Sequence, residues 1–361
     1  MTARLVLKRL SELENDALIG INGELIAVPG VGLALHDGGT PGGIMLEPPP
    51  QVAGSAGHNL IRNGNFIVQQ NGYEWLGIPT SGDIRYIADG WHFHRGGGST
   101  ANVAISRTYT ESEEDAYTAL RVNTFSGGLA SSYSILCQQI ADARLCIGRT
   151  VTVSYKARAT NPRRIAVVLR QDFDSATGTL ETFAGNAELT TDWQYFTHTF
   201  RVPDTPGSYT YGAASFTGLW FWLDAGSNYD DRTGGVGNTS GQFDITNVKM
   251  EISSIATPFG ATSYWDELLR VQQYFEKNTE TVYMAQGGYN DGATVKTVAY
   301  IPYRVPKVKT PSISGITSSY VTSPVASGIG TIGFNVLGTA NDVTSIARIT
   351  GFTADAEILP Y

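Results

Sequence analysis

The sequence has little of what several common protein classes require. Charged residues make up 16% of its 361 residues, and the formal net charge is −8. No run of Lys and Arg such as KKRK occurs, so we do not expect a nucleic-acid partner, because phosphate contacts need clustered positive charge. The sequence contains no window near the roughly 18 apolar residues of a membrane-spanning helix and no N-terminal secretion signal. A protein that is not inserted in a membrane is predicted.

Cysteine and histidine are also scarce, which limits metal and redox chemistry. Cys137 and Cys146 lie nine residues apart in strand-like sequence, without His or Cys at metal-ligand spacing. Buried thiols are the favoured interpretation, and a disulfide is the alternative. His92 and His94 form a His-x-His pair without a third ligand nearby, so we interpret them as partly exposed strand residues. The sequence predicts no metal and no cofactor.

Catalytic motifs are missing too. Neither HExxH nor GxSxG occurs in the chain. Glycoside hydrolysis needs two carboxyl groups about 5 to 9.5 Å apart across a cleft. The neighbouring acids at 172 and 174, and at 230 and 231, are of the kind that is usually solvated. A non-enzymatic protein is therefore predicted, with a site assembled from distant loops as the alternative.

What the sequence does contain is typical of strands joined by tight turns. It has 41 Gly and 18 Tyr, and Gly supplies the positive φ angles that turns require. The segment RTVTVSYKARA places Val151, Val153 and Tyr155 on one face, and GLWFWLDAG is an almost continuous apolar strand. An all-β fold is predicted, with a jelly-roll β-sandwich over residues 58–258.

Two smaller β regions flank this centre, which makes the chain multi-domain. Residues 1–50 hold short apolar runs between Gly-rich turns, and so short a region needs partners to complete a core. We predict a trimerising module there. Residues 51–57 are interpreted as a linker, because they continue a Pro-rich stretch into Gly, Ala and Ser. Residues 279–361 predict a small C-terminal β domain.

One amphipathic helix, SYWDELLRVQQYFEK, is predicted over residues 263–277, within a joint at 259–278. Ser263 is its expected N-cap. Tyr264, Leu268, Val271 and Phe275 follow the spacing of a coiled-coil seam. This face packs either on the chain's own domains or on two symmetry mates. The need of residues 1–50 for partners favours the trimer.

Sugar binding needs an aromatic face with polar side chains beside it. In GLWFWLD the two Trp side chains point one way and Phe221 the other, and the pattern does not decide which side is core. A Gly-rich loop of suitable composition follows. The candidate carbohydrate-binding residues are Trp220, Trp222, Tyr229, Asp231, Arg232 and Trp75.

Several motifs, in their order along the chain, resemble those of a known family of proteins. They are NLIRNGNF, ADGWHFHR, CQQI, LTTDWQYFTHTFRVP and GQFDITNVKMEISSIATPF. With them the chain resembles receptor-binding tail fibres or spikes of tailed bacteriophages and phage-like particles, and the central part looks like a carbohydrate-binding-module jelly roll. GELIAVPGVGLALHDGGTPGG is similar to a trimeric attachment module, and YIPYRVPKVKTPSI to the start of a C-terminal β domain.

The resemblance implies a homotrimeric virion appendage, on a tail or a head, held to other virion proteins by its N-terminal module. It implies attachment to a bacterial surface polysaccharide by multivalent, non-catalytic binding. The alternatives are a glycan-degrading hydrolase or esterase spike and a purely structural fibre. Related modules often have Glu after the Phe of NGNF, which holds a structural calcium with an Asp of the closing strand. Here Ile67 follows Phe66, so Asp244 lacks that partner.

Overall fold

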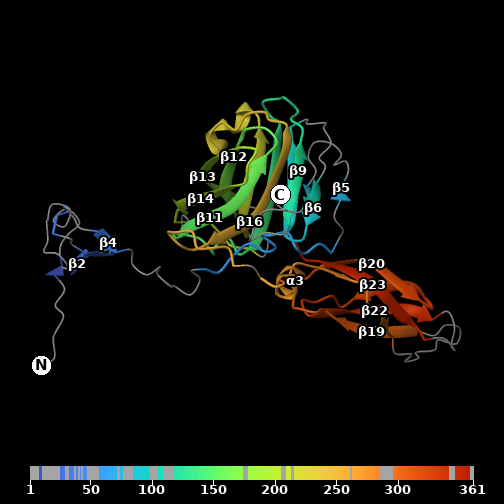
Figure 1. The fold of residues 1–361 in the computed structure, drawn as a ribbon. Helices are drawn as coiled ribbons and strands as arrows, with labels where there is room; N and C mark the ends of the chain where they lie inside the picture. Colours follow the sequence, from blue (N-terminus) through green and yellow to red (C-terminus); the bar gives the residue numbers. More distant parts are fainter. Residues whose placement is uncertain are drawn as a thin grey trace, which may run out of the picture. The chain divides into compact units, whose positions relative to one another are not determined.

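The computed structural model describes most of the chain beyond residue 56 and short stretches before it (Figure 1). The described residues are 8–9, 25–28, 32–35, 38–39, 41, 44–46, 57–70, 74–75, 84–97, 105–108, 118–173, 178–204, 209–212, 215–260, 262–284, 296–340 and 346–357. They are mostly strands, so the predicted all-β class is confirmed. The chain divides into two compact units, residues 1–56 with 253–255, and residues 57–252 with 256–361.

The first unit holds one small sheet. Its strands lie in the order β1-β2-β3-β4. They are β1 (Lys8–Arg9), β2 (Leu25–Val28), β3 (Gly32–Leu35) and β4 (Ile44–Leu46). Of the Gly-rich turns that the sequence predicts within residues 1–50, those at Asn22-Gly23 and Pro29-Gly30 lie outside the described residues. The trimerising role of residues 1–50 stays a prediction.

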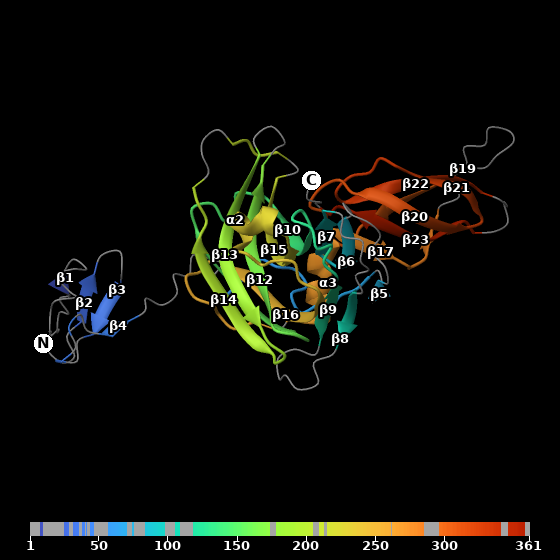
Figure 2. The same ribbon diagram turned by 90° about the horizontal axis from the view of Figure 1, so that it is seen from above.

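Two six-stranded sheets make up the central sandwich (Figure 2). Sheet I, in spatial order, consists of β13 (Thr179–Leu189), β12 (Arg163–Asp172), β15 (Phe216–Ala225), β10 (Tyr133–Ala141), β7 (Trp91–Gly96) and β6 (Ile84–Ala88). Sheet II consists of β14 (Gln194–Arg201), β11 (Thr150–Ala159), β16 (Gly241–Glu251), β9 (Ala119–Thr124), β8 (Ile105–Thr108) and β5 (Glu74–Trp75).

The main core lies between these sheets. Val151, Val153 and Tyr155 of β11 are buried in it, which confirms the alternation predicted for that strand. Leu219 and Phe221 of β15 approach the same core from sheet I. Side chains from both sheets thus interdigitate as in other face-to-face sandwiches.

The C-terminal part has a second, smaller core between two sheets. One sheet pairs β23 (Arg348–Asp355) with β17 (Phe275–Asn278), β18 (Val282–Tyr283) and β20 (Ser312–Ser319). The other has β22 (Gly333–Ala340) between β19 (Lys296–Pro302) and β21 (Val321–Ser327). Phe334 and Phe352 meet edge to face at 5.1 Å in this core.

The helix α3 (Tyr264–Gln272) begins where the sequence predicts and ends early. Ser263 Oγ accepts a hydrogen bond from the backbone N–H of Asp266 at 3.2 Å, so the predicted cap is confirmed. The predicted end at residue 277 is wrong. Phe275–Asn278 is strand β17, because the edge of β23 satisfies its backbone groups.

The four residues of the predicted coiled-coil seam lie in different surroundings. Leu268 and Val271 are buried against Val68 of the same chain, which is the alternative that the pattern left open. Phe275 lies on β17 with its ring 4.9 Å from that of Tyr86. Tyr264 is 45% exposed. The prediction that these four residues form a continuous trimer interface is therefore wrong, because the chain's own jelly roll covers Leu268 and Val271.

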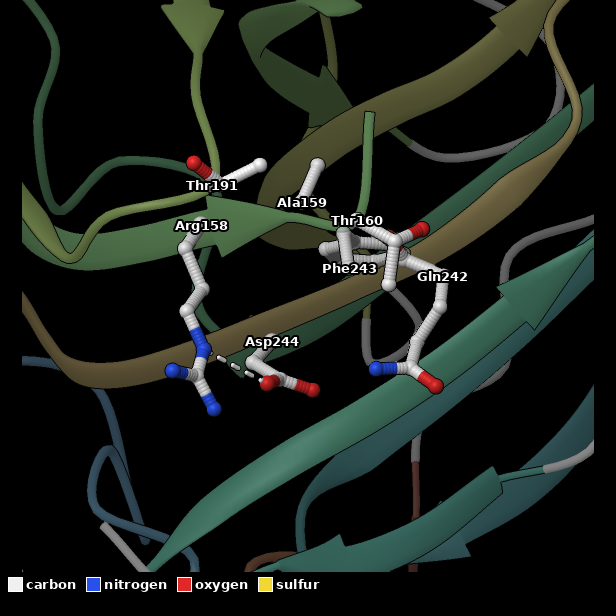
Figure 3. A pocket seen from close by; sticks show the side chains of 7 residues that line it. All are labelled: Arg158, Ala159, Thr160, Thr191, Gln242, Phe243 and Asp244. Atoms are coloured by element: carbon white, nitrogen blue, oxygen red, sulfur yellow. Dashed lines mark hydrogen bonds and ion pairs between the residues drawn. The ribbon is translucent and has the colours of Figure 1, made fainter. Parts of the chain in front are cut away.

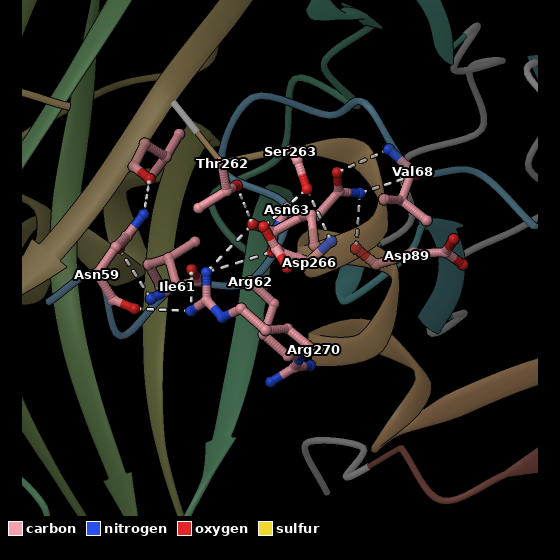
Figure 4. A network of polar contacts seen from close by, with 12 residues as sticks. Asn59, Ile61, Arg62, Asn63, Val68, Asp89, Thr262, Ser263, Asp266 and Arg270 are labelled. Atoms are coloured by element: carbon pink, nitrogen blue, oxygen red, sulfur yellow. Dashed lines mark hydrogen bonds and ion pairs between the residues drawn. The ribbon is translucent and has the colours of Figure 1, made fainter. Parts of the chain in front are cut away.

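Polar contacts fix α3 to the first residues of the jelly roll (Figure 4). Arg270 Nη2 donates to the carbonyl oxygens of Asn59 at 2.7 Å and Ile61 at 2.9 Å. Glu267 Oε1 accepts from the backbone N–H of Asn63 at 2.6 Å. The NLIRNGNF motif thus forms the docking surface of the helix.

Buried charges continue this contact into the C-terminal sheets. Lys307 Nζ lies 2.6 Å from Glu276 Oε2, and Arg62 Nη2 lies 3.2 Å from Glu357 Oε2. Burial raises the pKa of Glu357 to about 7 and lowers the pKa of Lys307. Arg62 also stacks on the ring of Tyr274 at 3.4 Å. The helix and both cores therefore belong to one packed unit.

Candidate carbohydrate-binding face

The structure shows which side of strand β15 faces the core, a point that the sequence pattern left open. Phe221 points into the main core between the sheets, whereas Trp220 and Trp222 lie on the outer face of sheet I. In the register, Trp222 is opposite Ile135 of β10 and Ala166 of β12. The outer face of sheet I is therefore apolar at its centre.

The loop predicted after β15 contains two short helical turns, η1 (Ser227–Tyr229) and α2 (Asp230–Thr233). Their residue Tyr229 places its ring 5.2 Å from that of Trp222. Tyr133 of β10 lies 5.4 Å from Tyr229 and 5.9 Å from Trp222. We call the following set the aromatic face: His94, Tyr133, Phe183, Trp220, Trp222 and Tyr229.

The two Trp residues form the floor of this face rather than its surface. Trp220 is 3% exposed and Trp222 is 2% exposed. The Trp220 indole lies over Gly218 of the same strand, since a Cβ at residue 218 would lie 2.9 Å from the indole Nε1. The expectation that these rings stack directly on a sugar is therefore corrected. Phe183 on β13 is the exposed ring of the set, at 43%.

Four linked charges border the aromatic face. Arg170 Nη2 binds Asp172 at 3.0 Å, and its Nη1 binds Glu181 at 3.2 Å. Arg232 Nη1 lies 3.5 Å from the other oxygen of Glu181. The Arg170 guanidinium also lies 4.7 Å from the ring centre of Trp220. We call Arg170, Asp172, Glu181 and Arg232 the charged rim.

Histidines on β7 extend the aromatic face in a neutral form. His94 Nε2 shares a hydrogen bond of 3.1 Å with the Tyr133 hydroxyl. Burial, together with Arg170, lowers the pKa of His94 to about 4. His92 is completely buried, against the expectation of partial exposure, and burial lowers its pKa to about 3. Both rings are therefore uncharged at neutral pH.

The structure brings together some of the predicted site residues and separates others. Trp220, Trp222, Tyr229 and Arg232 meet on one side of sheet I. Asp231 is exposed on α2. Trp75 lies on β5 of sheet II, so it belongs to the opposite sheet, and its side chain is outside the described residues.

Sequence reasoning missed Tyr133, Phe183, Arg170 and Glu181. Arg170 interrupts an apolar strand at an outward-facing position, which was the available signal. The partners of the others depend on register, because Phe183 is opposite Val168 and Glu181 is opposite Arg170. Register between strands is not visible in either strand alone.

Calcium does not fit the residues at Asp244. Arg121 and Arg158 occupy both carboxylate oxygens of Asp244. Ile67 packs with the apolar cluster under α3. Within the described ranges, His, Cys, Asp and Glu side chains form no group of three suited to a metal.

The two cysteines are buried and unpaired, as favoured from the sequence. Cys137 lies among the residues under the aromatic face, and Cys146 lies in the main core. Burial raises the pKa of each thiol to about 12. No helix among the residues that the structure describes has the length and apolarity to span a membrane.

Comparison with known protein families gives a match over part of the jelly roll. Residues 58–210 match the model of a carbohydrate binding domain. The match contains His94, Tyr133, Arg170 and Phe183, while β15 and the two helical turns follow it. Among curated proteins, none matches this chain.

Solved structures of carbohydrate-binding modules are similar to part of the chain. A CBM4 structure has 20% identity and a TM-score of 0.33, over 53% of this chain and 98% of that one. A Clostridium thermocellum family 11 module, in complex with a β-1,3-1,4-mixed-linked tetrasaccharide, has 13% identity and a TM-score of 0.31, over 51% and 98%. The enzymatically active domain of bacteriophage CBA120 tailspike protein 4 has 16% identity and a TM-score of 0.30, over 45% and 19%.

Proposed function

We propose that this chain is a homotrimeric receptor-binding protein of a phage or phage-like particle, on its tail or its head. Its jelly roll, residues 58–258, binds a polysaccharide of the bacterial surface without cleaving it. The N-terminal module, residues 1–50, holds the chain to other virion proteins, and 51–57 links the two. The match of residues 58–210 to a carbohydrate binding domain supports the glycan partner.

The observation that carries the proposal is the pairing of the aromatic face with its charged rim. Phe183 offers an exposed ring to the apolar side of a pyranose. Arg232 and Glu181 lie beside it as donor and acceptor for sugar hydroxyls. Because the two Trp rings beneath are buried, the surface above them is held in place by packing, which lowers the entropy cost of binding.

Trimer formation would make weak single sites sufficient. Three sites on one appendage raise the apparent affinity by roughly 10² to 10⁴ through effective concentration. Since Leu268 and Val271 are buried within the chain, contact between copies at α3 would use its exposed side chains Tyr264, Trp265 and Leu269. Light scattering should give about three times 38.8 kDa, and a monomeric mass would contradict the trimer. Trp265→Asp should lower the mass if α3 contributes.

Glycan binding is tested by calorimetric titration of the full chain. The probes are purified bacterial surface polysaccharides, xylohexaose and the mixed-linked tetrasaccharide. Phe183→Ala and Arg232→Gln should each weaken binding about tenfold, or about 1.4 kcal/mol. Tyr283→Ala is the matched control, because Tyr283 is exposed on the C-terminal strand β18.

Each remaining outcome points to one alternative. Release of reducing ends or acetate from the polysaccharide would identify a glycan-degrading spike. A trimer that binds none of the polysaccharides would favour a purely structural fibre. Equal binding by wild type, Phe183→Ala and Arg232→Gln would place the sugar elsewhere on the chain.

A further inference from the structure

The outer face of sheet II carries a row of alternating charges across three neighbouring strands. Asp244 on β16 is opposite Arg121 on β9 and Arg158 on β11. Arg121 donates from Nε at 2.8 Å and from Nη2 at 3.0 Å, one bond to each carboxylate oxygen. Arg158 donates from Nε alone at 2.9 Å. Two guanidinium groups thus face one carboxylate, which leaves one positive charge.

Arg158 keeps an unused edge beside a hollow. Within the described residues its two Nη atoms make no hydrogen bond, and its side chain is 33% exposed. The hollow has a volume of about 310 Å³ and is lined by Arg158, Thr160, Thr191, Gln242 and Asp244, among others. In Figure 3 the side chains of Arg158, Asp244 and Gln242 extend to the same side of neighbouring strands.

An aromatic ring lies next to Arg158 on the side of β14. The Arg158 guanidinium lies 4.9 Å from the ring centre of Trp193. Tyr195, two residues further on, is 52% exposed and pairs in register with Lys156 of β11. Aromatic surface next to fixed donors and acceptors is the composition that saccharide sites use.

We infer that this hollow is a second saccharide site, specific for a sugar that carries a carboxylate. The ligand carboxylate accepts two hydrogen bonds from the Nη edge of Arg158, the geometry that favours Arg over Lys. Gln242 and Thr160 contact its hydroxyl groups. A neutral sugar would leave the surplus positive charge uncompensated, so the acidic sugar is preferred. The site lies on sheet II and does not depend on the aromatic face of sheet I.

The test is calorimetric titration of the full chain with trimers of galacturonate, mannuronate and guluronate, and with neutral galactotriose. At least one acidic trimer should bind tenfold or more tightly than galactotriose, and its affinity should fall as salt is added. Arg158→Gln should remove this preference. Arg164→Gln is the matched control, since Arg164 is an exposed residue of sheet I paired with Glu188.

Arg158→Gln is expected to fold, because Arg121 still binds both oxygens of Asp244. Thermal unfolding checks this, and Tyr195→Ala provides a second, surface-only variant that should weaken the acidic trimer. Phe183→Ala should leave uronate binding unchanged, which separates this site from the aromatic face. Failure of all three acidic trimers, equal affinity for galactotriose, or unchanged binding by Arg158→Gln would each overturn the inference.

Discussion

The outer faces of the two jelly-roll sheets are built from similar antiparallel strands, yet one carries aromatic rings at its centre and the other carries charged side chains. On sheet I every residue of β15 is buried, because the core lies on one side and the aromatic face on the other. On sheet II the central strand β16 is also buried over its last nine residues, but these include polar ones such as Asp244 and Thr246, and only the edge strand β14 alternates between more and less exposed residues. The central strands of both sheets are therefore buried on both sides, and the faces differ in the chemical character of their outer side chains.

Charge is distributed differently on the two faces as well. Sheet I carries ions at the border of its aromatic face, where Arg170, Glu181 and Arg232 form a chain of pairs. Sheet II carries its ions across the middle of its outer face, with Asp244 between two arginines. Polar groups thus lie in the middle of the outer face of sheet II and around the aromatic face of sheet I.

The largest expected effect comes from removing a ring under the aromatic face. Trp222→Ala should lower the free energy of unfolding by about 3 to 5 kcal/mol, because a buried ring is lost and a cavity remains. Tyr195→Ala, on the solvent-facing side of sheet II, should change it by about 0.5 kcal/mol or less. Urea unfolding measures both. Similar losses for the two variants would contradict the contrast between the faces.

A smaller loss of stability is expected when one methyl group is added at Gly218, next to Trp220. In Gly218→Ala the new Cβ would lie 2.9 Å from Trp220 Nε1 and 3.3 Å from Phe216 Cε2. Overpacking of this kind costs about 1 to 3 kcal/mol. Gly260→Ala is the control, since no atom would lie within 4 Å of its Cβ. Unchanged stability of Gly218→Ala would mean that Trp220 can move away, and that the face is less tightly packed than described.

The last expected effect concerns the pH dependence of stability. The folded pKa of His94 is lowered to about 4, below its ordinary value of 6.5. The unfolded chain therefore binds the proton first as pH falls, so stability is complete above about pH 6.5 and decreases towards pH 4, by up to about 1.4 kcal/mol per unit. His94→Gln should flatten this decrease, measured by urea unfolding at pH 7 and pH 5.

Comparison of the variant with wild type isolates this effect. Glu357, whose folded pKa is raised to about 7, contributes a slope of opposite sign between pH 4.5 and 7. The difference between variant and wild type, rather than the wild-type curve, therefore reports on His94. A His94→Gln curve parallel to wild type would contradict a buried neutral imidazole.

The sequence by itself determined the features that depend on neighbouring residues. Alternation in β11 predicted which side chains enter the core, and Ser263 with Asp266 predicted where α3 begins. The opposite directions of Trp222 and Phe221 also followed from the strand period alone. These features could be predicted because a strand or a helix repeats within a few residues.

Only the tertiary structure decided features that depend on distant partners. Helix α3 ends at Gln272 because the edge of β23, some 80 residues later, pairs with the next residues. Asp244 meets Arg121 across 123 positions, and Arg170 meets Glu181 through the register of β12 and β13. The Trp222 ring packs against Tyr229 of the turn η1, a contact that the strand sequence alone does not reveal. Pairing register and coverage are properties of two surfaces in contact, so neither segment alone encodes them.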